Sequence, residues 1–141
     1  MKSLFEMEQY LADTHSLIWY LTSDTRLSTE ARRRFEISEK GEGIIFVSVM
    51  TIIEMIYLQE KGKIPKQLLE LFKRSFIQET NASFQVVSLD YELALSLSNI
   101  PREAVPEMPD RIIAATACSL GIPLITKDER LHQWEGVVTI W

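Results

Sequence analysis

A buried β-strand is predicted at Ile44-Ile45-Phe46-Val47-Ser48, where apolar and β-branched residues run together behind Gly41 and Gly43. A helical pattern follows directly, from residue 51 to residue 59. Strands that alternate with helices are typical of a parallel sheet with helices on both faces. This stretch therefore predicts one repeating unit of an α/β fold, and the rest of the chain can be compared with it.

The same alternation continues on both sides of this stretch. Upstream, it predicts a short strand at Tyr10-Leu11-Ala12, a helix over 14–21, and a second helix that begins after an N-cap at Ser28 and stops at Gly41 or before it. Downstream, it predicts a helix over 67–78, a strand over 84–89, a helix over 91–99 capped by Asp90, a loop over 101–109, a helix over 110–120 closed by Gly121, and strands over 122–126 and 137–140. The whole chain thus fits an α/β fold.

The composition excludes several classes of protein. The chain has 141 residues and a formal net charge of −5, so we expect a single domain that is not held on nucleic acid by its overall charge. With one cysteine, Cys118, and two histidines, it has no internal disulfide, and a zinc site of Cys or His ligands is not expected. No apolar run approaches the roughly 20 residues that span a bilayer, and the first residues make a poor signal peptide. We therefore expect a cytoplasmic protein with no contact with a membrane.

Acidic residues lie where such folds bind their ligands. Ligands of parallel α/β sheets bind beyond the carboxyl ends of the strands, where the strand order reverses. Asp13 comes directly after the first predicted strand, and Asp128 comes shortly after the fourth. Glu54 lies in the helix after the second strand, and Asp110 starts the helix that leads into the fourth. We therefore expect these four carboxylates to converge at one edge of the sheet.

Each acid also has a plainer interpretation. Asp13 and Asp110 could be helix N-caps, because Asp is favoured at that position. Asp128 could be an exposed turn residue. Glu54 stands among apolar neighbours, which predicts a buried carboxylate that needs a partner. Its plainer interpretation is an ion pair with a nearby Arg or Lys, or a charge at the edge of the apolar stripe.

Four converging carboxylates predict a cation. They would repel one another unless some are protonated or a divalent ion lies among them. Oxygen ligands without His or Cys select Mg²⁺ or Mn²⁺ over Zn²⁺. Such an ion lowers the pKa of a bound water and stabilises charge on a phosphoryl group. The chemistry that follows from this arrangement is phosphodiester hydrolysis.

Four segments resemble the motifs of PIN-domain nucleases, in the same order along the chain. They are LADTHSLIW at 11–19, SVMTIIEM at 48–55, PDRIIAATA at 109–117 and LITKDERL at 124–131. The resemblance extends from about residue 10 to the end, and it is to the VapC-like toxins of bacterial and archaeal toxin–antitoxin pairs in particular. Each motif is degenerate, but the four together at suitable spacing are fairly specific.

The resemblance implies a three-layer α/β/α sandwich with a five-stranded parallel sheet of order 3-2-1-4-5. That order places the first and fourth strands side by side, and with them Asp13 and Asp128. The resemblance also implies a metal-dependent endoribonuclease, with Asp13, Glu54, Asp110 and Asp128 around Mg²⁺ or Mn²⁺, and with Thr126 and Arg111 in supporting positions. It further implies an RNA substrate, a cognate antitoxin and a homodimer. The alternative is a non-catalytic PIN-like domain that binds protein or RNA, against which the presence of all four acids argues.

Two features depart from the family pattern. Close relatives often carry His-x-Asp-Pro-Phe-Asp-Arg at the third motif, where this chain has Val105-Pro106-Glu107-Met108-Pro109-Asp110-Arg111. The Asp110-Arg111 pair is kept, while substrate contacts near this loop are expected to differ. The chain before Asp13 is also longer than is usual, and we interpret residues 1–8 as a tail of a single domain that spans residues 1–141.

An RNA substrate needs positive charge near the acids. Arg111, Lys127 and Arg130 are the cations that lie close to them in sequence. His15 is interpreted as a packed histidine without a role in the site. Trp19 is interpreted either as part of the core or as part of a surface for a partner.

Overall fold

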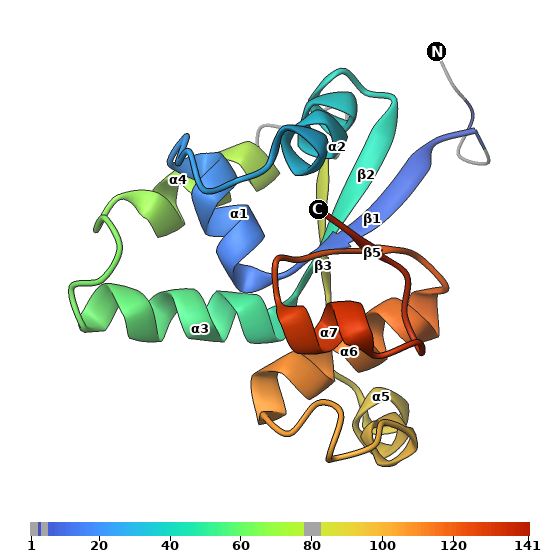
Figure 1. Ribbon diagram of the computed structural model, residues 1–141. Helices are drawn as coiled ribbons and strands as arrows, with labels where there is room; N and C mark the ends of the chain where they lie inside the picture. The colour runs from blue at the N-terminus through green and yellow to red at the C-terminus, as the bar shows by residue number, and fades with distance from the viewer. Residues whose placement is uncertain (1–2, 4–5, 78–82) are drawn as a thin grey trace.

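A computed structural model describes residues 3, 6–77 and 83–141 of the chain (Figure 1). Five parallel strands form one sheet of order β3-β2-β1-β4-β5, which confirms the order predicted above. Ala12 of β1 lies opposite Val47 of β2 on one side and Ile125 of β4 on the other. The strands are β1 (Glu8–Ala12), β2 (Gly43–Ser48), β3 (Phe84–Val87), β4 (Leu124–Ile125) and β5 (Thr139–Ile140).

The helices begin and end close to the positions that the sequence predicts. The cap at Ser28 accepts the N–H of Ala31 at 3.0 Å, and the cap at Asp90 accepts the N–H of Leu93 at 2.8 Å. Both predicted caps are therefore confirmed. The described helices are α1 (Thr14–Leu21), α2 (Thr29–Glu39), α3 (Val49–Glu60), α4 (Leu68–Ile77), α5 (Tyr91–Ser96), the 3₁₀ turn η1 (Leu97–Asn99), α6 (Met108–Leu120) and α7 (Glu129–Gln133).

Some boundaries differ from the prediction. β4 and β5 are shorter than predicted, and β1 begins at Glu8, which therefore belongs to the sheet. Helix α6 begins at Met108 instead of Asp110, because Pro109 is tolerated in the first turn, where its missing N–H has no helical partner to lose. The N-cap position of α6 is Glu107, so the interpretation of Asp110 as an N-cap is wrong.

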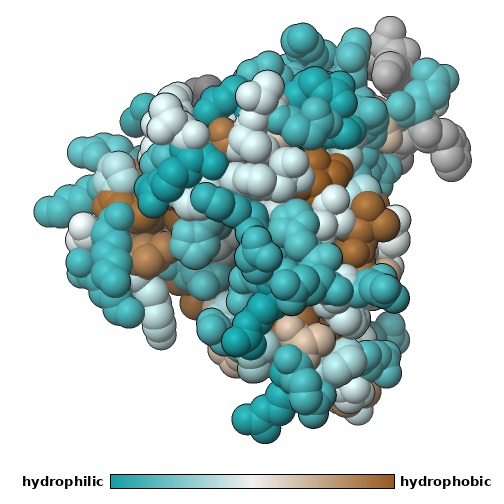
Figure 2. All heavy atoms as spheres, in the orientation of Figure 1, coloured by the Kyte–Doolittle hydropathy of each residue, from teal (hydrophilic) through white to brown (hydrophobic). Residues whose placement is uncertain are grey.

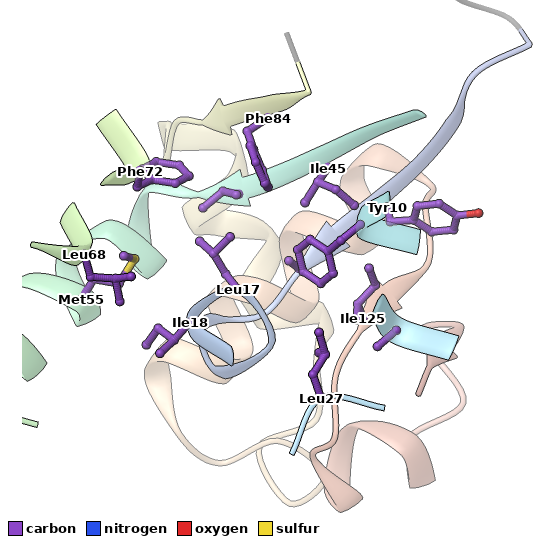
Figure 3. Packing of buried hydrophobic residues seen from close by; sticks show 14 residues of the cluster. Tyr10, Leu17, Ile18, Leu27, Ile45, Met55, Leu68, Phe72, Phe84 and Ile125 are labelled. Carbon is purple, nitrogen blue, oxygen red and sulfur yellow. The ribbon is translucent and has the colours of Figure 1, made fainter. Parts of the chain in front are cut away.

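The two faces of the sheet bury two separate hydrophobic clusters. Alternate residues of a strand point to opposite faces. Tyr10 and Ala12 of β1 pack with α1, α2 and α4, and Figure 3 shows Tyr10, Leu17 and Ile45 as members of this cluster. Leu11, between them, packs with Leu124 and with residues of α5 and α6. Helices thus cover both faces, which confirms the predicted three-layer α/β/α architecture.

Helix α3 is less buried than its sequence predicts. Met55 is fully buried, but Ile53, Ile56 and Tyr57 are 42%, 38% and 61% exposed. Figure 2 shows hydrophobic surface gathered at the side of the molecule where α3 and α4 lie. Glu54 consequently lies on a half-covered helix and is itself half-buried. No helix in the described part of the chain is long and apolar enough to cross a membrane.

Gly121 provides a test of the end of α6. Its φ of +66° lies in the left-handed region, so we expect Gly121→Ala to lower the free energy of unfolding by about 1 kcal/mol. An added Cβ would meet no atom within 4 Å, so the cost is conformational and not a clash. Gly121→Asn is expected to cost less, because Asn tolerates this region. Urea unfolding measures both, and equal losses for the two variants would contradict this account.

Candidate active site

Asp13 is fixed between β1 and β4. Its backbone N–H donates to the carbonyl of Ile125 at 3.1 Å, so strand pairing positions it. Its Oδ1 accepts the N–H of Ser16 at 2.9 Å, which confirms the interpretation of Asp13 as the N-cap of α1. Its Oδ2 accepts the hydroxyl of Thr126 at 2.5 Å. The carboxylate therefore caps its own helix and also contacts the end of a neighbouring strand.

Thr126 joins Asp13 to Asp128. The side chain of Thr126 is fully buried, and its hydroxyl oxygen accepts the N–H of Asp128 at 3.0 Å while it donates to Asp13. The Oδ1 of Asp128 accepts the N–H groups of Arg130 and Leu131 at 2.8 and 3.1 Å. Asp128 is therefore the half-buried N-cap of α7 and not an exposed turn residue. Because β1 and β4 are neighbours, both acids lie at one edge of the sheet.

Glu54, on α3, is joined to this edge of the sheet by hydrogen bonds that involve Thr14 and Thr51. Its Oε1 accepts the hydroxyl of Thr14 at 2.5 Å. The hydroxyl oxygens of Thr14 and Thr51 lie 3.0 Å apart, and since the single proton of Thr14 goes to Glu54, Thr51 donates to Thr14. Within the described residues no salt bridge involves Glu54, so the predicted ion pair with Arg or Lys is not found there.

Sequence reasoning missed both threonines. Thr51 lies one turn before Glu54 on α3, and Thr14 directly follows Asp13. These spacings are the feature of the sequence that could have indicated the two threonines. A hydrogen bond between residues 37 apart in the chain, however, depends on the tertiary fold.

Asp110 is the fourth carboxyl group, and its pKa shows that it lies among the others. Asp110 is half-buried in the first turn of α6. Burial, and then the negative charges of its neighbours, raise the pKa of Asp110 to about 6; these neighbours are Asp128, Glu107, Glu54 and Asp13. Burial also raises the pKa of Asp13. The structure therefore brings all four predicted acids into one electrostatically coupled group.

The donor set fits a hard divalent cation that keeps part of its water. Carboxylate oxygens are the ligands that Mg²⁺ prefers, and Mg²⁺ is commonly held by one or two carboxylates with several waters. Across residues 3, 6–77 and 83–141, no three His, Cys, Asp or Glu side chains are arranged so that they could hold an ion among themselves. These side chains do not form a closed protein cage, so an ion at this edge would have to complete its coordination with water.

Arg111 binds backbone carbonyls at the ends of η1. Its Nη2 donates to the carbonyls of Leu97 and Ile100 at 2.7 and 3.0 Å. These bonds fix the start of α6, and with it Asp110, against the end of η1. Of the cations predicted near the site, Lys127 and Arg130 are exposed.

Asp110→Asn is expected to stabilise the metal-free protein at pH 8. The pKa of about 6 in the folded state exceeds the value of about 4 in an unfolded chain, so the folded state binds the proton more tightly. Stability is therefore lost as the pH rises from about 4 through about 6. After allowance for solvent screening of a half-exposed group, the gain at pH 8 is on the order of 1 kcal/mol. Urea unfolding in EDTA at pH 8 and pH 4.5 measures it, and a gain of equal size at both pH values would contradict this origin.

Known proteins resemble this chain over nearly its whole length. The family model of the PIN domain matches residues 10–136. Ribonuclease VapC22 of Mycobacterium tuberculosis is 28% identical over 137 residues, which cover 96% of this chain and 100% of that protein. A toxin–antitoxin complex from Klebsiella pneumoniae superimposes with a TM-score of 0.61 and 26% identity, over 92% of this chain and 96% of that one. VapBC2 from Rickettsia felis, bound to a promoter DNA fragment, gives a TM-score of 0.69 and 12% identity, over 94% and 97%. The chain belongs to the PIN domain family.

Proposed function

We propose that this protein is a metal-dependent endoribonuclease and the toxin of a type II toxin–antitoxin pair. The observation that carries the proposal is the coupled group of Asp13, Glu54, Asp110 and Asp128 at the carboxyl edge of a PIN-type sheet. Two relatives support it, because one is named a ribonuclease and the other is a toxin–antitoxin complex.

Mg²⁺ or Mn²⁺ would be held by Asp13, Asp110 and Asp128, in part through bound water, with Glu54 either as a further ligand or as the group that orients the attacking water. When bound, such an ion activates water and stabilises charge on a phosphoryl group. Glu54 is suited to accept the proton of that water, because Thr14 fixes one of its oxygens. The expected products carry a 5′-phosphate and a 3′-hydroxyl.

Supporting residues hold these carboxylates in place. Thr126 fixes one oxygen of Asp13 and the backbone of Asp128 at the same time. Arg111 supports Asp110 by anchoring the first turn of α6. Residues that hold the ligands of a metal ion in position typically contribute about 10-fold to 100-fold to activity, and we expect a contribution of this size here.

We further propose the partners that the resemblance implies. They are an RNA substrate, a cognate antitoxin and a second copy of the chain. We also propose that residues 1–141 form a single domain that acts in the cytoplasm.

The test is RNA cleavage by the purified chain with Mg²⁺, with Mn²⁺ and with EDTA. We expect cleavage with either metal and none with EDTA, and the chemistry of the new ends identifies hydrolysis. Cleavage that persists in EDTA would indicate a contaminating ribonuclease. No cleavage of any RNA, together with no Mn²⁺ binding by calorimetry, would favour the non-catalytic alternative.

A further inference from the structure

A group of rings and cations borders the acidic site. His15 and Trp19 lie one turn apart on α1, with ring centroids 5.8 Å apart. The ammonium of Lys127 lies 5.8 Å from the centroid of the Trp19 ring, and the guanidinium of Arg26 lies 4.9 Å from it. We name His15, Trp19, Arg26 and Lys127 the Trp19 strip.

The Trp19 strip lies next to the carboxylates. His15 follows Asp13 by two residues, and Lys127 stands between Thr126 and Asp128. Figure 1 shows the start of α1 and the segment before α7 at the same edge of the sheet, where β1 ends. The side chains of His15, Arg26 and Lys127 are exposed, so a ligand can reach them.

Trp19 contacts each of the other residues of the strip. It is half-buried and packs edge-on against Trp141, with centroids 5.8 Å apart. An indole ring attracts a cation that lies over its face. Trp19 can therefore keep Arg26 and Lys127 close to the acidic edge without joining them to a carboxylate of that edge.

Lys127 is the cation of the strip that is available to bind a phosphate group. Arg26 is paired with Asp24 at 2.8 Å, whereas no salt bridge involves Lys127 in the part of the chain that the structure describes. Its neighbour Asp128 uses Oδ1 to cap α7. In a chain of net charge −5, such a local cation is needed to bring a polyanion to an acidic site.

The exposed ring of His15 and the unpaired cation of Lys127, which both contact Trp19, suit one class of ligand. Proteins bind single-stranded nucleic acid by stacking bases on rings and by placing phosphates on cations, while the bases of a duplex are stacked on one another. We propose that the Trp19 strip binds single-stranded RNA beside the cleaved bond, with a base on His15 and the adjacent phosphate on Lys127. The inference rests on the proposed nuclease function and assigns the contacts that position the RNA to His15 and Lys127.

The test measures RNA binding separately from cleavage. A fluorescein-labelled single-stranded RNA of 12 nucleotides and mixed sequence is titrated with Mg²⁺ present, in an Asp13→Asn background that stops cleavage. We expect Lys127→Ala to weaken binding about tenfold and to reduce the slope of log K against log salt by about 0.7. We expect His15→Ala to weaken binding about tenfold and His15→Phe to restore it, because Phe keeps a stacking surface. A duplex of the same sequence should not respond to His15→Ala.

Lys40→Ala is the matched control. Lys40 is an exposed lysine at the end of α2, just before β2 begins, and so at the opposite edge of the sheet. Its loss should leave RNA affinity unchanged, and thermal unfolding should show that all variants are folded.

The outcomes separate this inference from the nuclease function. If Lys127→Ala and His15→Ala bind RNA as tightly as the background protein, the strip is refuted, even if the unaltered chain cleaves RNA. If these variants lose affinity but the unaltered chain cuts no RNA, the strip is supported and the nuclease function fails. If the background protein binds no RNA at all, the strip is refuted, and cleavage by the unaltered chain decides the nuclease function separately.

Discussion

Asp13→Asn is expected to abolish the proposed RNA cleavage, with a loss in kcat/KM on the order of 10³-fold or more. Asparagine keeps the size of the side chain and an oxygen that can accept the N–H of Ser16, so the cap of α1 is retained. It removes the negative charge of the Asp13 carboxylate, which the proposed metal ion needs in its ligand. The measurement is the initial rate of RNA cleavage with Mn²⁺, together with the melting temperature of each protein.

Asp90→Asn is the control for this experiment. Asp90 also caps a helix through its carboxylate, at 2.8 Å from the N–H of Leu93, and it is exposed. It is not among the charges that raise the pKa of Asp110. Asp90→Asn should therefore cleave RNA at the full rate. A folded Asp13→Asn protein that keeps more than one tenth of the activity would remove Asp13 from the site.

The sequence correctly predicts the ends of helices that depend on a few neighbouring residues. The caps at Ser28 and Asp90 and the terminating Gly121 depend on a few neighbouring residues, and the structure confirms them. The strand order came from the resemblance, since alternating strands and helices alone allow several orders. With that order known, adjacent strand ends bring Asp13 and Asp128 together without further information.

The sequence does not predict which apolar residues of a helix are covered by the rest of the chain. The isoleucines around Glu54 predict a buried helix, but Ile53 and Ile56 are exposed in this chain. Periodicity identifies apolar positions and does not show whether the chain itself covers them. The ion pair of Glu54 with Arg or Lys that this burial predicted is not found among the described residues, where Glu54 is half-buried.

Contacts between segments that lie far apart in the sequence also cannot be predicted from the sequence alone. Thr14 and Thr51 meet only because α1 and α3 both start at the carboxyl ends of adjacent strands. Lys127 lies over Trp19 because β4 pairs with β1. The sequence alone therefore assigns no role to His15, although this residue stands at the centre of the motif that carries Asp13.

Glu54→Gln is expected to lower kcat/KM about 100-fold, whether Glu54 binds the metal or orients the water. Glutamine can still accept the hydroxyl of Thr14, so the packing of α3 is retained while the charge and the basicity are lost. Glu60→Gln, at an exposed position near the end of the same helix, is the control and should be fully active. Equal rates for the two variants would place Glu54 outside the reaction.

Thr14→Val shows whether the threonine pair acts through Glu54. It removes the hydroxyl that fixes Oε1, so we expect a loss of about tenfold, which Thr14→Ser should largely restore. In the Glu54→Gln background the same change should cause no further loss, because residues that act as one unit are not additive. The buried hydroxyl of Thr51 loses its partner in Thr14→Val, at a cost of about 1–3 kcal/mol, so rates are compared well below the melting temperature. Losses that add in the double variant would mean that Thr14 acts on another part of the site, such as the neighbouring Asp13.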